Sequence, residues 1–548
     1  MKRRSAFQLM GAAAATAMVG AGCGGPSSSS NVLTVGMPNG PLTENNNPFS
    51  PTSTSNSLGY RWVIWEPLAQ VNLLDPDGEP TPWLAKKWVW AEDYKSVELT
   101  IRTGAKWSDG KPLSAEDIAF TFNMIKDNEA LNLDAVSYKD IKASGDKVTL
   151  TFDSSEFVNK GRVLGTIPMV PKHVWSKVKD PAKDPVKKPI GSGPYTLSNW
   201  SSQAITLKPN DGYWGGKPQV PQLRYTSYND NSAQSTALGN GECQWAYVFL
   251  SNYKKVFIKK DPEHNRLWFP SGLGIHVLFI NTERKPFDSV ELRQAMNLVI
   301  DREAVYKQGE SGLYPMVDSP TGIPRPVGDK FIAKKYADAK HKVDVAQAKK
   351  LLKGAGFTLS DGVLSDPDGK PVKLKLVDPS GWNDYLASLQ IISDDLKQIG
   401  IDATVDTMTV DRWNNAMATG DFDASLHWTN TGATPWDMYA GVMDGKQYKK
   451  LGKNASWNFG RFKNDDATAA LAKYANTSDD AERAKALETL QDVMVNEVPV
   501  IPLVAGPIGA EYSTKNWTGW PNEDDQYAMP QPTQPSASQI LMKLKPAK

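Results

Sequence analysis

Residues 372–405 of the chain, VKLKLVDPSGWNDYLASLQIISDDLKQIGIDATV, contain the pattern that decides the fold. Apolar and polar residues alternate over 372–376 and again over 401–405, which predicts two strands. An amphipathic helix over 383–399 is predicted between them, because apolar residues recur at spacings of 3, 3, 4 and 3 at Leu386, Leu389, Ile392, Leu396 and Ile399. Asn383 is the expected N-cap of this helix and Gly400 its expected terminator. A strand, a helix and a strand in this order form a β-α-β unit, which predicts an α/β fold with a parallel sheet.

The next informative stretch is residues 426–441, LHWTNTGATPWDMYAG. It begins like the end of a strand, because Ala424, Leu426 and Trp428 alternate with polar residues. It continues as a polar loop in which aromatic rings alternate with neutral hydroxyl and amide groups. Flat apolar faces beside neutral donors and acceptors suit a ligand that is itself neutral, polyhydroxylated and ring-shaped. The alternative is a loop whose tryptophans only pin it to the core.

Size and composition exclude several classes of protein. At 548 residues the chain is too long for a single core and is expected to form two or three domains. Its composition is that of a globular protein except for its 18 tryptophans. Five histidines and two cysteines leave little material for a transition-metal site. The net charge of +1 gives no electrostatic reason to expect a nucleic acid as partner.

The N-terminus predicts export and a lipid anchor. Residues 2–4, Lys-Arg-Arg, precede a short alanine-rich apolar run that ends in small residues before Cys23. This layout predicts a signal peptide at 1–22, and its apolar run is shorter than the ~20 residues that a membrane-spanning helix needs. Cys23 is similarly placed to the lipidated cysteine of a bacterial lipobox, with Gly20 where leucine is usual. Residues 23–31 would then be a flexible tether that holds an extracytoplasmic protein to the membrane. The paired arginines leave a twin-arginine signal open as an alternative.

Catalysis is not indicated by any motif. The sequence contains no Gly-x-Ser-x-Gly, no Walker phosphate loop, no His-Glu-x-x-His and no Cys-x-x-Cys. Residues 523–525, Glu-Asp-Asp, are adjacent carboxylates that rarely straddle a glycosidic bond at the required ~5–9 Å, so we expect a solvated acidic turn. Cys243 is expected to be a small buried apolar residue. We therefore expect a binding protein with no catalytic residue, no metal and no cofactor.

Four motifs, taken in order, carry a resemblance to a known family. They are residues 101–118 (IRTGAKWSDGKPLSAEDI), 191–195 (GSGPY) with 205–215 (ITLKPNDGYWG), 280–302 (INTERKPFDSVELRQAMNLVIDR) and 344–357 (DVAQAKKLLKGAGF). Two strands are expected at 88–90 and 97–101, just before and at the start of the first motif. A helix is expected at the end of this motif, with Ser114 and Asp117 as its capping box. Together these motifs resemble the bacterial extracellular solute-binding proteins of family 5, the oligopeptide and dipeptide class that serves ABC importers.

The resemblance implies an architecture. The expected fold is the two-lobed periplasmic-binding-protein type II, or Venus-flytrap, fold of the α/β class with an inserted third domain. Lobe I would comprise 32–60, 191–275 and 505–548, the inserted subdomain 61–190, and lobe II 276–504. Two chain crossings, near 274–281 and 498–504, would form the hinge.

The resemblance also bears on the ligand. Peptide binders of the family hold the ligand's ammonium group with an aspartate shortly after a tryptophan. With Trp428 in that place, the aspartate positions fall on 430–431 and Thr434, and no acid occurs between Asp423 and Asp437. A buried ammonium without a carboxylate is costly, so the pattern is similar to the oligosaccharide-binding branch and implies β-linked gluco-oligosaccharides such as cellobiose and cello-oligosaccharides. An oligopeptide is the alternative. A nickel, haem or opine carrier is a third interpretation, and the scarcity of histidine disfavours nickel.

We expect aromatic rings and neutral polar groups to hold the ligand. The predicted rings are Trp436, Trp428, Trp382, Trp520, Trp245, Trp65, Tyr439, Tyr385 and Tyr527. The predicted polar partners are Asn430, Thr431, Asn39 and Asn522. Seven other tryptophans stand in framework motifs and are assigned to packing, namely Trp62, Trp88, Trp90, Trp107, Trp175, Trp200 and Trp214. A monomer closed around its ligand would then dock on the permease of an ABC importer.

Overall fold

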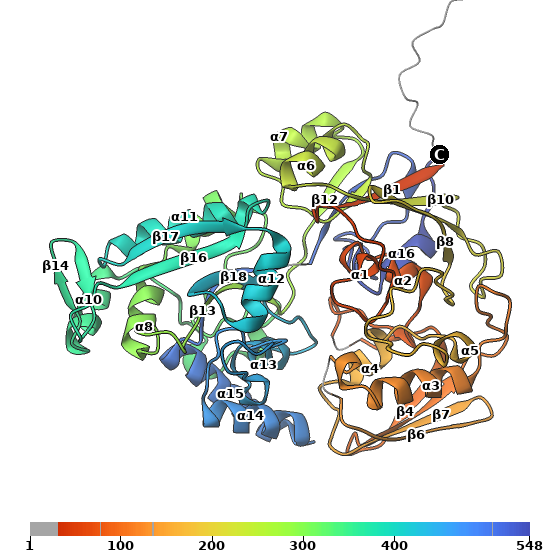
Figure 1. Ribbon diagram of the computed structural model, residues 1–548, viewed down its shortest axis with the longest axis horizontal. Coiled ribbons are helices and arrows are strands. Elements are labelled where there is room, and N and C mark those ends of the chain that lie inside the picture. The colour runs from red at the N-terminus through yellow and green to blue at the C-terminus, as the bar shows by residue number, and fades with distance from the viewer. Residues whose placement is uncertain (1–30, 77, 134–135, 507) are drawn as a thin grey trace, which may run out of the picture.

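The computed structural model describes residues 31–76, 78–133, 136–506 and 508–548. Two lobes lie side by side, and a smaller unit lies below one of them (Figure 1). Each of the three units is built on its own sheet, so the predicted two-lobed α/β fold is confirmed. The predicted signal peptide, the lipidation site Cys23 and the tether up to residue 30 lie outside the described residues.

Lobe II is built on a five-stranded sheet in the order β17-β16-β18-β13-β19. The strands are β13 (Ile275–Ile280), β16 (Lys373–Pro379), β17 (Asp402–Met408), β18 (Ala424–Trp428) and β19 (Val500–Ala505). The predicted β-α-β unit is confirmed, because β16 and β17 pair in parallel and α11 (Asn383–Lys397) joins them. Gly400 follows the helix with a φ of +81°. The N-cap is Trp382 rather than the predicted Asn383, whose side chain instead donates to Ser232 Oγ of lobe I at 3.3 Å.

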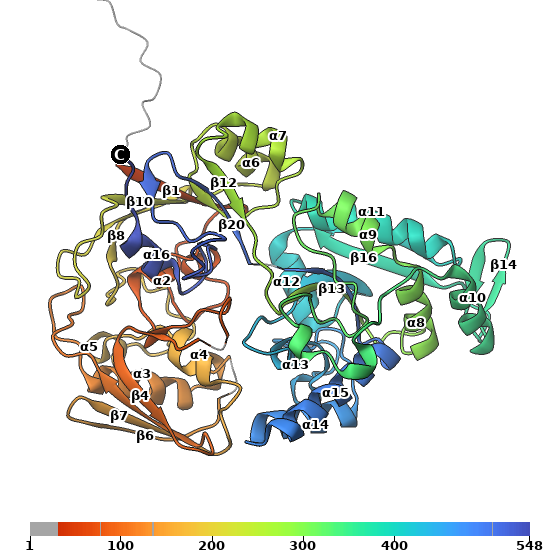
Figure 2. The same cartoon turned by 180° about the vertical axis from the view of Figure 1, so that it is seen from behind.

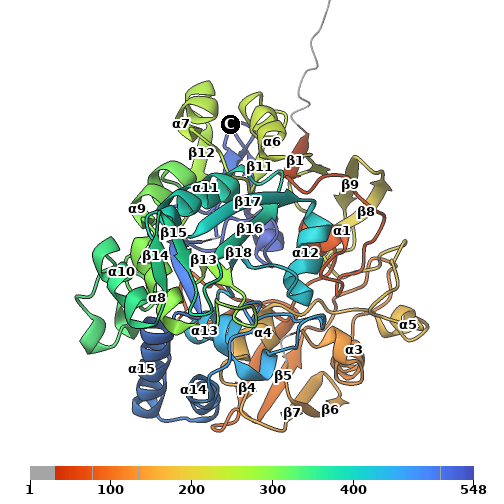
Figure 3. The same cartoon turned by 60° about the vertical axis from the view of Figure 1, so that its left-hand side comes forward.

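Helices cover both faces of this sheet (Figure 3). One face carries α8 (Val290–Val299), α10 (Val345–Gly354) and α11, and the other carries α12 (Val410–Thr419), α13 (Trp436–Met443), α14 (Asp465–Asn476) and α15 (Asp480–Glu497). The central strand β13, IHVLFI, shows the reason. Leu278 and Ile280 enter the first core while Val277 and Phe279 enter the second, because successive side chains of a strand point to opposite faces.

The polar loop predicted over 429–441 is shorter than expected. Helix α13 begins at Trp436, directly after Pro435, whose φ of −63° suits the start of a helix. The loop, which we call the cleft loop, therefore covers only residues 429–435. The predicted site residues Trp436 and Tyr439 lie on the helix instead.

Lobe I is built on a seven-stranded sheet in the order β12-β20-β11-β1-β10-β9-β8. The strands are β1 (Val32–Met37), β8 (Tyr195–Trp200), β9 (Ala204–Pro209), β10 (Gln222–Ser227), β11 (Trp245–Ala246), β12 (Asn265–Trp268) and β20 (Ala510–Ser513). Strand β1 runs parallel to both of its neighbours, β10 and β11. Cys243, just before β11, is buried and free, as predicted.

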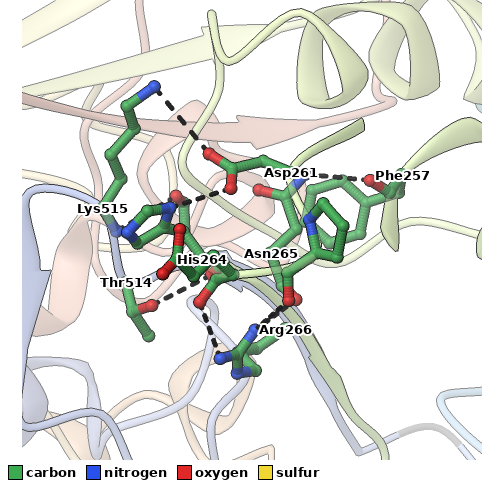
Figure 4. Close-up of polar contacts among 10 residues, drawn as sticks. Phe257, Asp261, His264, Asn265, Arg266, Thr514 and Lys515 are labelled. Carbon is green, nitrogen blue, oxygen red and sulfur yellow. Dashed lines mark hydrogen bonds and ion pairs between the residues drawn. The ribbon is translucent and has the colours of Figure 1, made fainter. Parts of the chain in front are cut away.

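A polar cluster fixes the β12–β20 edge of lobe I (Figure 4). His264 Nδ1 lies 2.8 Å from Asp261 Oδ1, and Lys515 Nζ lies 3.8 Å from Asp261 Oδ2. Asn265 donates to the carbonyl of Phe257 at 2.9 Å. Burial raises the pKa of Asp261, but the hydrogen bond from His264 and the nearby positive charges outweigh it, so the pKa lies below its ordinary value. The edge that receives both chain crossings is therefore anchored.

The inserted subdomain has a four-stranded sheet in the order β4-β5-β7-β6. Its elements include β4 (Ala85–Trp90), β5 (Ser96–Ile101), β6 (Tyr138–Ser144), β7 (Lys147–Phe152), α3 (Ala115–Lys126) and α4 (Lys160–Gly165). The predicted strand pair is confirmed as the antiparallel β4 and β5. The capping box is confirmed as well, with Ser114 and Asp117 bonding reciprocally at the start of α3.

The two chain crossings lie several residues from their predicted positions. The first runs over 269–274, between β12 and β13, and the second over 506–509, between β19 and β20, with residue 507 outside the described residues. The predicted segments 274–281 and 498–504 are mostly β13 and β19 themselves, which pair with each other inside lobe II. Strands β12 and β20 lie side by side at the lobe I end of the crossings (Figure 2).

Candidate ligand-binding site

The loops that follow the parallel strands of the two sheets meet between the lobes. Strands β16, β17 and β18 of lobe II end there, as do β1, β10 and β11 of lobe I. Asn231 Nδ2 of lobe I donates to Asp384 Oδ1 of lobe II at 3.4 Å, and Tyr314 Oη donates to Tyr247 Oη at 3.4 Å. Ligands of open α/β sheets bind beyond the carboxyl ends of the strands, so the candidate site lies between these two edges.

A cavity of about 1330 Å³ opens between the inserted subdomain, lobe II and the C-terminal segment of lobe I. The inserted subdomain contributes the segment around Asn72, strand β4 and helix α4. Lobe II contributes residues 330–335, the cleft loop residues 431–434 and parts of α14 and α15, and lobe I contributes Met529, Gln534 and Pro535. Small-molecule sites usually measure about 300–1,000 Å³. The cavity is larger than this range.

Aromatic side chains line much of this cavity. Trp88, Trp90, Tyr94 and Phe157 come from the inserted subdomain, and Tyr474 comes from α14. Trp88 and Trp90 share one face of β4, because residues two apart on a strand point the same way. Both are half-buried and pack against the core of the subdomain, as predicted, and they also line the cavity. The alternation Trp-Val-Trp was the sequence signal that could have identified them.

One ion pair joins the inserted subdomain to lobe II at the wall of the cavity. The guanidinium of Arg162 on α4 contacts the carboxylate of Asp437 on α13, and both residues line the cavity. The two side chains are 19% and 7% exposed. A buried carboxylate paired in this way is not available to a ligand cation without loss of the ion pair.

Three predicted rings lie together on lobe II. Trp382 and Tyr385, at the end of β16 and on α11, have ring centroids 5.6 Å apart, and Trp382 lies 6.1 Å from Trp428 at the end of β18. Trp413 packs against Trp382 at 4.9 Å and Trp428 at 6.0 Å. Trp382 and Trp428 remain half-buried, whereas Tyr385 is buried. Of the three, only the two indoles offer surface to a ligand.

The cleft loop touches the first hinge crossing. A Cβ atom at Gly274 would lie 2.0 Å from Thr431 Oγ1, so only glycine permits this approach. Thr431 lines the cavity. Asn430 is half-buried, and its side-chain nitrogen lies 3.5 Å from the position that a Cβ atom at Gly441 would take. The predicted polar residues Asn430 and Thr431 are therefore placed on the loop that joins the site to the hinge.

Five predicted rings belong to the cores instead. The side chains of Trp65, Trp245, Tyr439 and Trp520 are 0–4% exposed, and each donates to a backbone carbonyl, namely those of Ile190, Pro530, Thr321 and Trp517. Trp436 is half-buried and donates to the carbonyl of Leu471 on α14. The structure gives the polar group of each of these five side chains a partner within the protein.

The remaining predicted residues support local structure. Tyr527 donates to the carbonyl of Gly519 at 2.8 Å, and Lys543 Nζ lies 3.6 Å from its ring centroid. Asn522 holds a turn in which it accepts from the backbone N–H groups of residues 524 and 525, within the exposed acidic turn that was predicted. Asn39 donates to the carbonyl of Ser57 at 2.8 Å. None of the three lines the cavity.

A group of buried carboxyls at the contact between the lobes was not predicted. Glu310, Asp378 and Asp384 are buried, and Ser388 Oγ donates to Glu310 Oε1 at 3.2 Å. Burial raises the pKa of Asp384 to about 6. Burial, and then the charge of Asp384, raises the pKa of Glu310. No sequence signal indicates this group, because its members come from separate segments of the chain, and α6 (Asn231–Gly239) of lobe I meets Asp384 among them through a hydrogen bond.

The described residues offer neither a metal-binding cluster nor a membrane-spanning helix. Within 31–76, 78–133, 136–506 and 508–548, no three His, Cys, Asp or Glu side chains are grouped to hold a metal ion. Within the same ranges, no helix is long and apolar enough to cross a membrane.

Comparison with known proteins identifies a family. Residues 79–450 match the family described as bacterial extracellular solute-binding proteins, family 5 Middle. The chain is 25% identical over 474 residues to the probable peptide-binding protein YejA of Agrobacterium fabrum, covering 76% of each chain. It is 26% identical over 433 residues to the oligopeptide-binding protein AppA of Bacillus subtilis, covering 74% of each chain.

A solved structure resembles the whole described fold. The periplasmic oligopeptide-binding protein of Thermotoga maritima, crystallised with bound mannohexaose, superimposes with a TM-score of 0.86 at 26% sequence identity. The match covers 95% of this chain and 99% of the other. These relatives are solute-binding proteins rather than enzymes.

Proposed function

The chain belongs to the bacterial extracellular solute-binding proteins of family 5, and we propose that it captures neutral oligosaccharides for an ABC importer. We propose β-linked gluco-oligosaccharides such as cellobiose and longer cello-oligosaccharides as the ligands. The lobes would close on the sugar, and the closed form would deliver it to the permease.

The chemistry of the cavity supports a sugar. Its volume of about 1330 Å³ suits a chain of several rings. Trp88 and Trp90 offer flat apolar faces on which the C–H face of a pyranose can stack. The neutral groups of Thr431 and Gln534 line the same space and suit equatorial hydroxyls.

The single observation that carries the proposal is the ion pair between Arg162 and Asp437. Asp437 is the carboxylate that borders the cleft loop, and no other acid occurs between Asp423 and Asp437. A peptide binder needs a carboxylate for the ligand's terminal ammonium, because an unpaired buried ammonium is costly. Here the available carboxylate is already neutralised by an arginine of the same protein. A ligand without charge fits this arrangement best.

Direct contacts would supply part of the affinity. A neutral hydrogen bond contributes about 1 kcal/mol and an aromatic contact about 1 kcal/mol beyond its buried area. Micromolar binding requires about 8 kcal/mol. Burial of apolar surface on closure would supply the rest.

Oligopeptides are the alternative ligand. The names of YejA and AppA describe peptide binding, and charged side chains such as Lys160, Lys330 and Asp480 also line the cavity. Charged groups at the rim suit the termini and side chains of a peptide.

Calorimetric titration separates the two ligand classes. We expect saturable heat from cellopentaose, with weaker heat from cellobiose, because the longer sugar fills more of the cavity. Mannohexaose tests whether the sugar type matters. A mixed tripeptide panel should give no heat. Tight binding of a tripeptide, with no heat from any of the sugars, would overturn the proposal in favour of peptides.

Export and anchoring are also proposed. The lipid would be attached at Cys23, which lies outside the described residues, and the protein would act as a monomer outside the cytoplasm. Labelling cells with a radioactive fatty acid should mark the wild-type protein and not the Cys23→Ala variant. Equal labelling of both would refute lipidation at Cys23.

A further inference from the structure

The arm of the inserted subdomain that carries Arg162 is held rigidly before it reaches lobe II. Arg162 Nη1 donates to Asn159 Oδ1 at 3.1 Å, and Asn159 Nδ2 donates to Glu156 Oε2 at 2.6 Å. Glu156 itself is 2% exposed and accepts from the N–H of Ser137 at 2.8 Å. This chain of hydrogen bonds orients the guanidinium toward α13, because Asn159 holds the guanidinium and Glu156 holds Asn159.

The same arm packs on lobe II beside the ion pair. The guanidinium carbon of Arg483 on α15 lies 3.5 Å from the centroid of the Phe157 ring, and Phe157 lies 6.4 Å from Tyr474 on α14. The side chain of Arg483 is only 10% exposed. The position of Arg162 relative to Asp437 is therefore set by an interface and not by one flexible side chain.

Asp437 in turn is pressed against the cleft loop. A Cβ atom at Gly432 would lie 1.7 Å from Asp437 Oδ2, so the carboxylate occupies the space beside the glycine backbone. Asp437, Gly432 and Thr431 all line the cavity. The carboxylate thus stands at the part of the wall where the loop would meet a ligand, and Arg162 of the inserted subdomain contacts it there.

We propose that Arg162 is a specificity-determining residue that excludes ligands bearing an ammonium group by occupying Asp437. This inference rests on the proposed function, since it explains how the cavity comes to prefer neutral ligands. A ligand ammonium that approached Asp437 would meet the guanidinium, and like charges repel strongly where water is excluded. Without the arginine, the negative charge of Asp437 would attract a ligand ammonium to this part of the cavity wall.

Two ligands that differ by charge alone provide the test. Cellopentaose and the fully deacetylated glucosamine pentamer share the β-1,4-linked backbone, and only the second carries ammonium groups. Calorimetry would compare the wild type with Arg162→Met, Arg162→Lys and Arg162→Met/Asp437→Asn. We expect the wild type to bind the aminated pentamer at least tenfold more weakly than cellopentaose.

Each variant has a stated expectation. Arg162→Met should improve the relative affinity for the aminated sugar by at least tenfold. Arg162→Lys keeps the positive charge and should keep the wild-type preference. The double variant lacks both charges and should lose the gain. An unchanged ratio in Arg162→Met, or the same gain in the double variant, would overturn the proposal.

The variant Asp437→Asn gives an independent test in case Arg162→Met does not fold. Asp437→Asn removes the negative charge that faces the guanidinium, so it should improve binding of the aldonic acid of cellopentaose, which carries a terminal carboxylate, relative to cellopentaose. No change in that ratio would also count against the proposal.

Failure of the proposed function is distinguishable. If the wild type binds no sugar, the same variants are titrated with a tripeptide and its N-acetylated form. A gain for the free ammonium in Arg162→Met, absent from the double variant, would support the role of Arg162. If the affinity ratio of the free tripeptide to its N-acetylated form is the same in all variants, the role of Arg162 is refuted.

Discussion

Glu66 is expected to make stability depend strongly on pH. Its carboxylate is fully buried where the inserted subdomain joins lobe I, and it accepts from Trp83 Nε1 at 2.6 Å, Tyr213 Oη at 2.6 Å and Trp214 Nε1 at 3.1 Å. Burial raises its pKa to about 7 from the ordinary 4.5, and the hydrogen bonds only partly oppose this rise. The folded state therefore holds the Glu66 proton more tightly than the unfolded state does.

The sign and the size of the effect follow from linkage. The extra stability is fully present below pH 4.5 and is lost as the pH rises through 7. At about 1.36 kcal/mol for each unit of pKa difference, the free energy of unfolding should fall by about 2.5 kcal/mol between pH 5 and pH 8 from this group alone.

The assay compares the wild type with Glu66→Gln, which cannot titrate at this position. Urea unfolding followed by tryptophan fluorescence at pH 5 and pH 8 gives the free energy of unfolding at each pH. The wild type should lose about 2.5 kcal/mol more than the variant over this range. Equal losses in the two proteins would show that Glu66 does not titrate as its burial implies, and would refute the reasoning.

Three further predictions concern ligand binding and are measured by calorimetry with cellopentaose. Gly274→Ala should weaken binding at least tenfold, because the added methyl would lie 2.0 Å from Thr431 Oγ1 and displace either the hinge crossing or the cleft loop. Trp88→Ala should weaken binding about five- to fiftyfold, the equivalent of about 1–2 kcal/mol, through loss of a stacking surface. Binding should weaken about tenfold between pH 5 and pH 7, because Asp384, with a pKa of about 6 and Glu310 beside it, disfavours lobe contact once ionised. Asp384→Asn should flatten this pH dependence.

Matched controls separate these effects from general damage. Gly354→Ala adds a methyl at a helical glycine with nothing within 4 Å and should leave binding unchanged. Val89→Ala alters the residue beside Trp88 on the opposite face of β4, which is 53% exposed, and should also be neutral. If either control weakens binding as much as its counterpart, the assignment of that site fails. A pH dependence that persists in Asp384→Asn would locate the titrating group elsewhere.

Strong local periodicity made much of the fold predictable. The spacing of apolar residues from Leu386 to Ile399 identifies α11 correctly, because a helix with one buried face must repeat every three to four residues. The capping box at Ser114 was equally predictable from the sequence, since it depends on two side chains three residues apart. The hinge was misplaced because a buried strand and a lobe crossing both lie in the same apolar region of sequence, and only pairing tells them apart.

The candidate site was less predictable because aromatic residues serve cores and ligands alike. Trp245 stands in a strand of two residues, and nothing nearby in sequence shows that its indole will meet Pro530. Trp88 belongs to a motif that also builds the framework, yet its ring borders the cavity. Arg162 carried no signal, because its partner Asp437 is remote in sequence and meets it only when the inserted subdomain docks on lobe II.

The most direct measurement is a crystal structure of the protein with cellopentaose. The sugar should lie in the cavity between the inserted subdomain and lobe II, with its rings against Trp88 or Trp90 and with Arg162 still paired to Asp437. A sugar bound elsewhere on the surface would contradict the account. So would a peptide whose terminal ammonium contacts Asp437 after displacing the guanidinium.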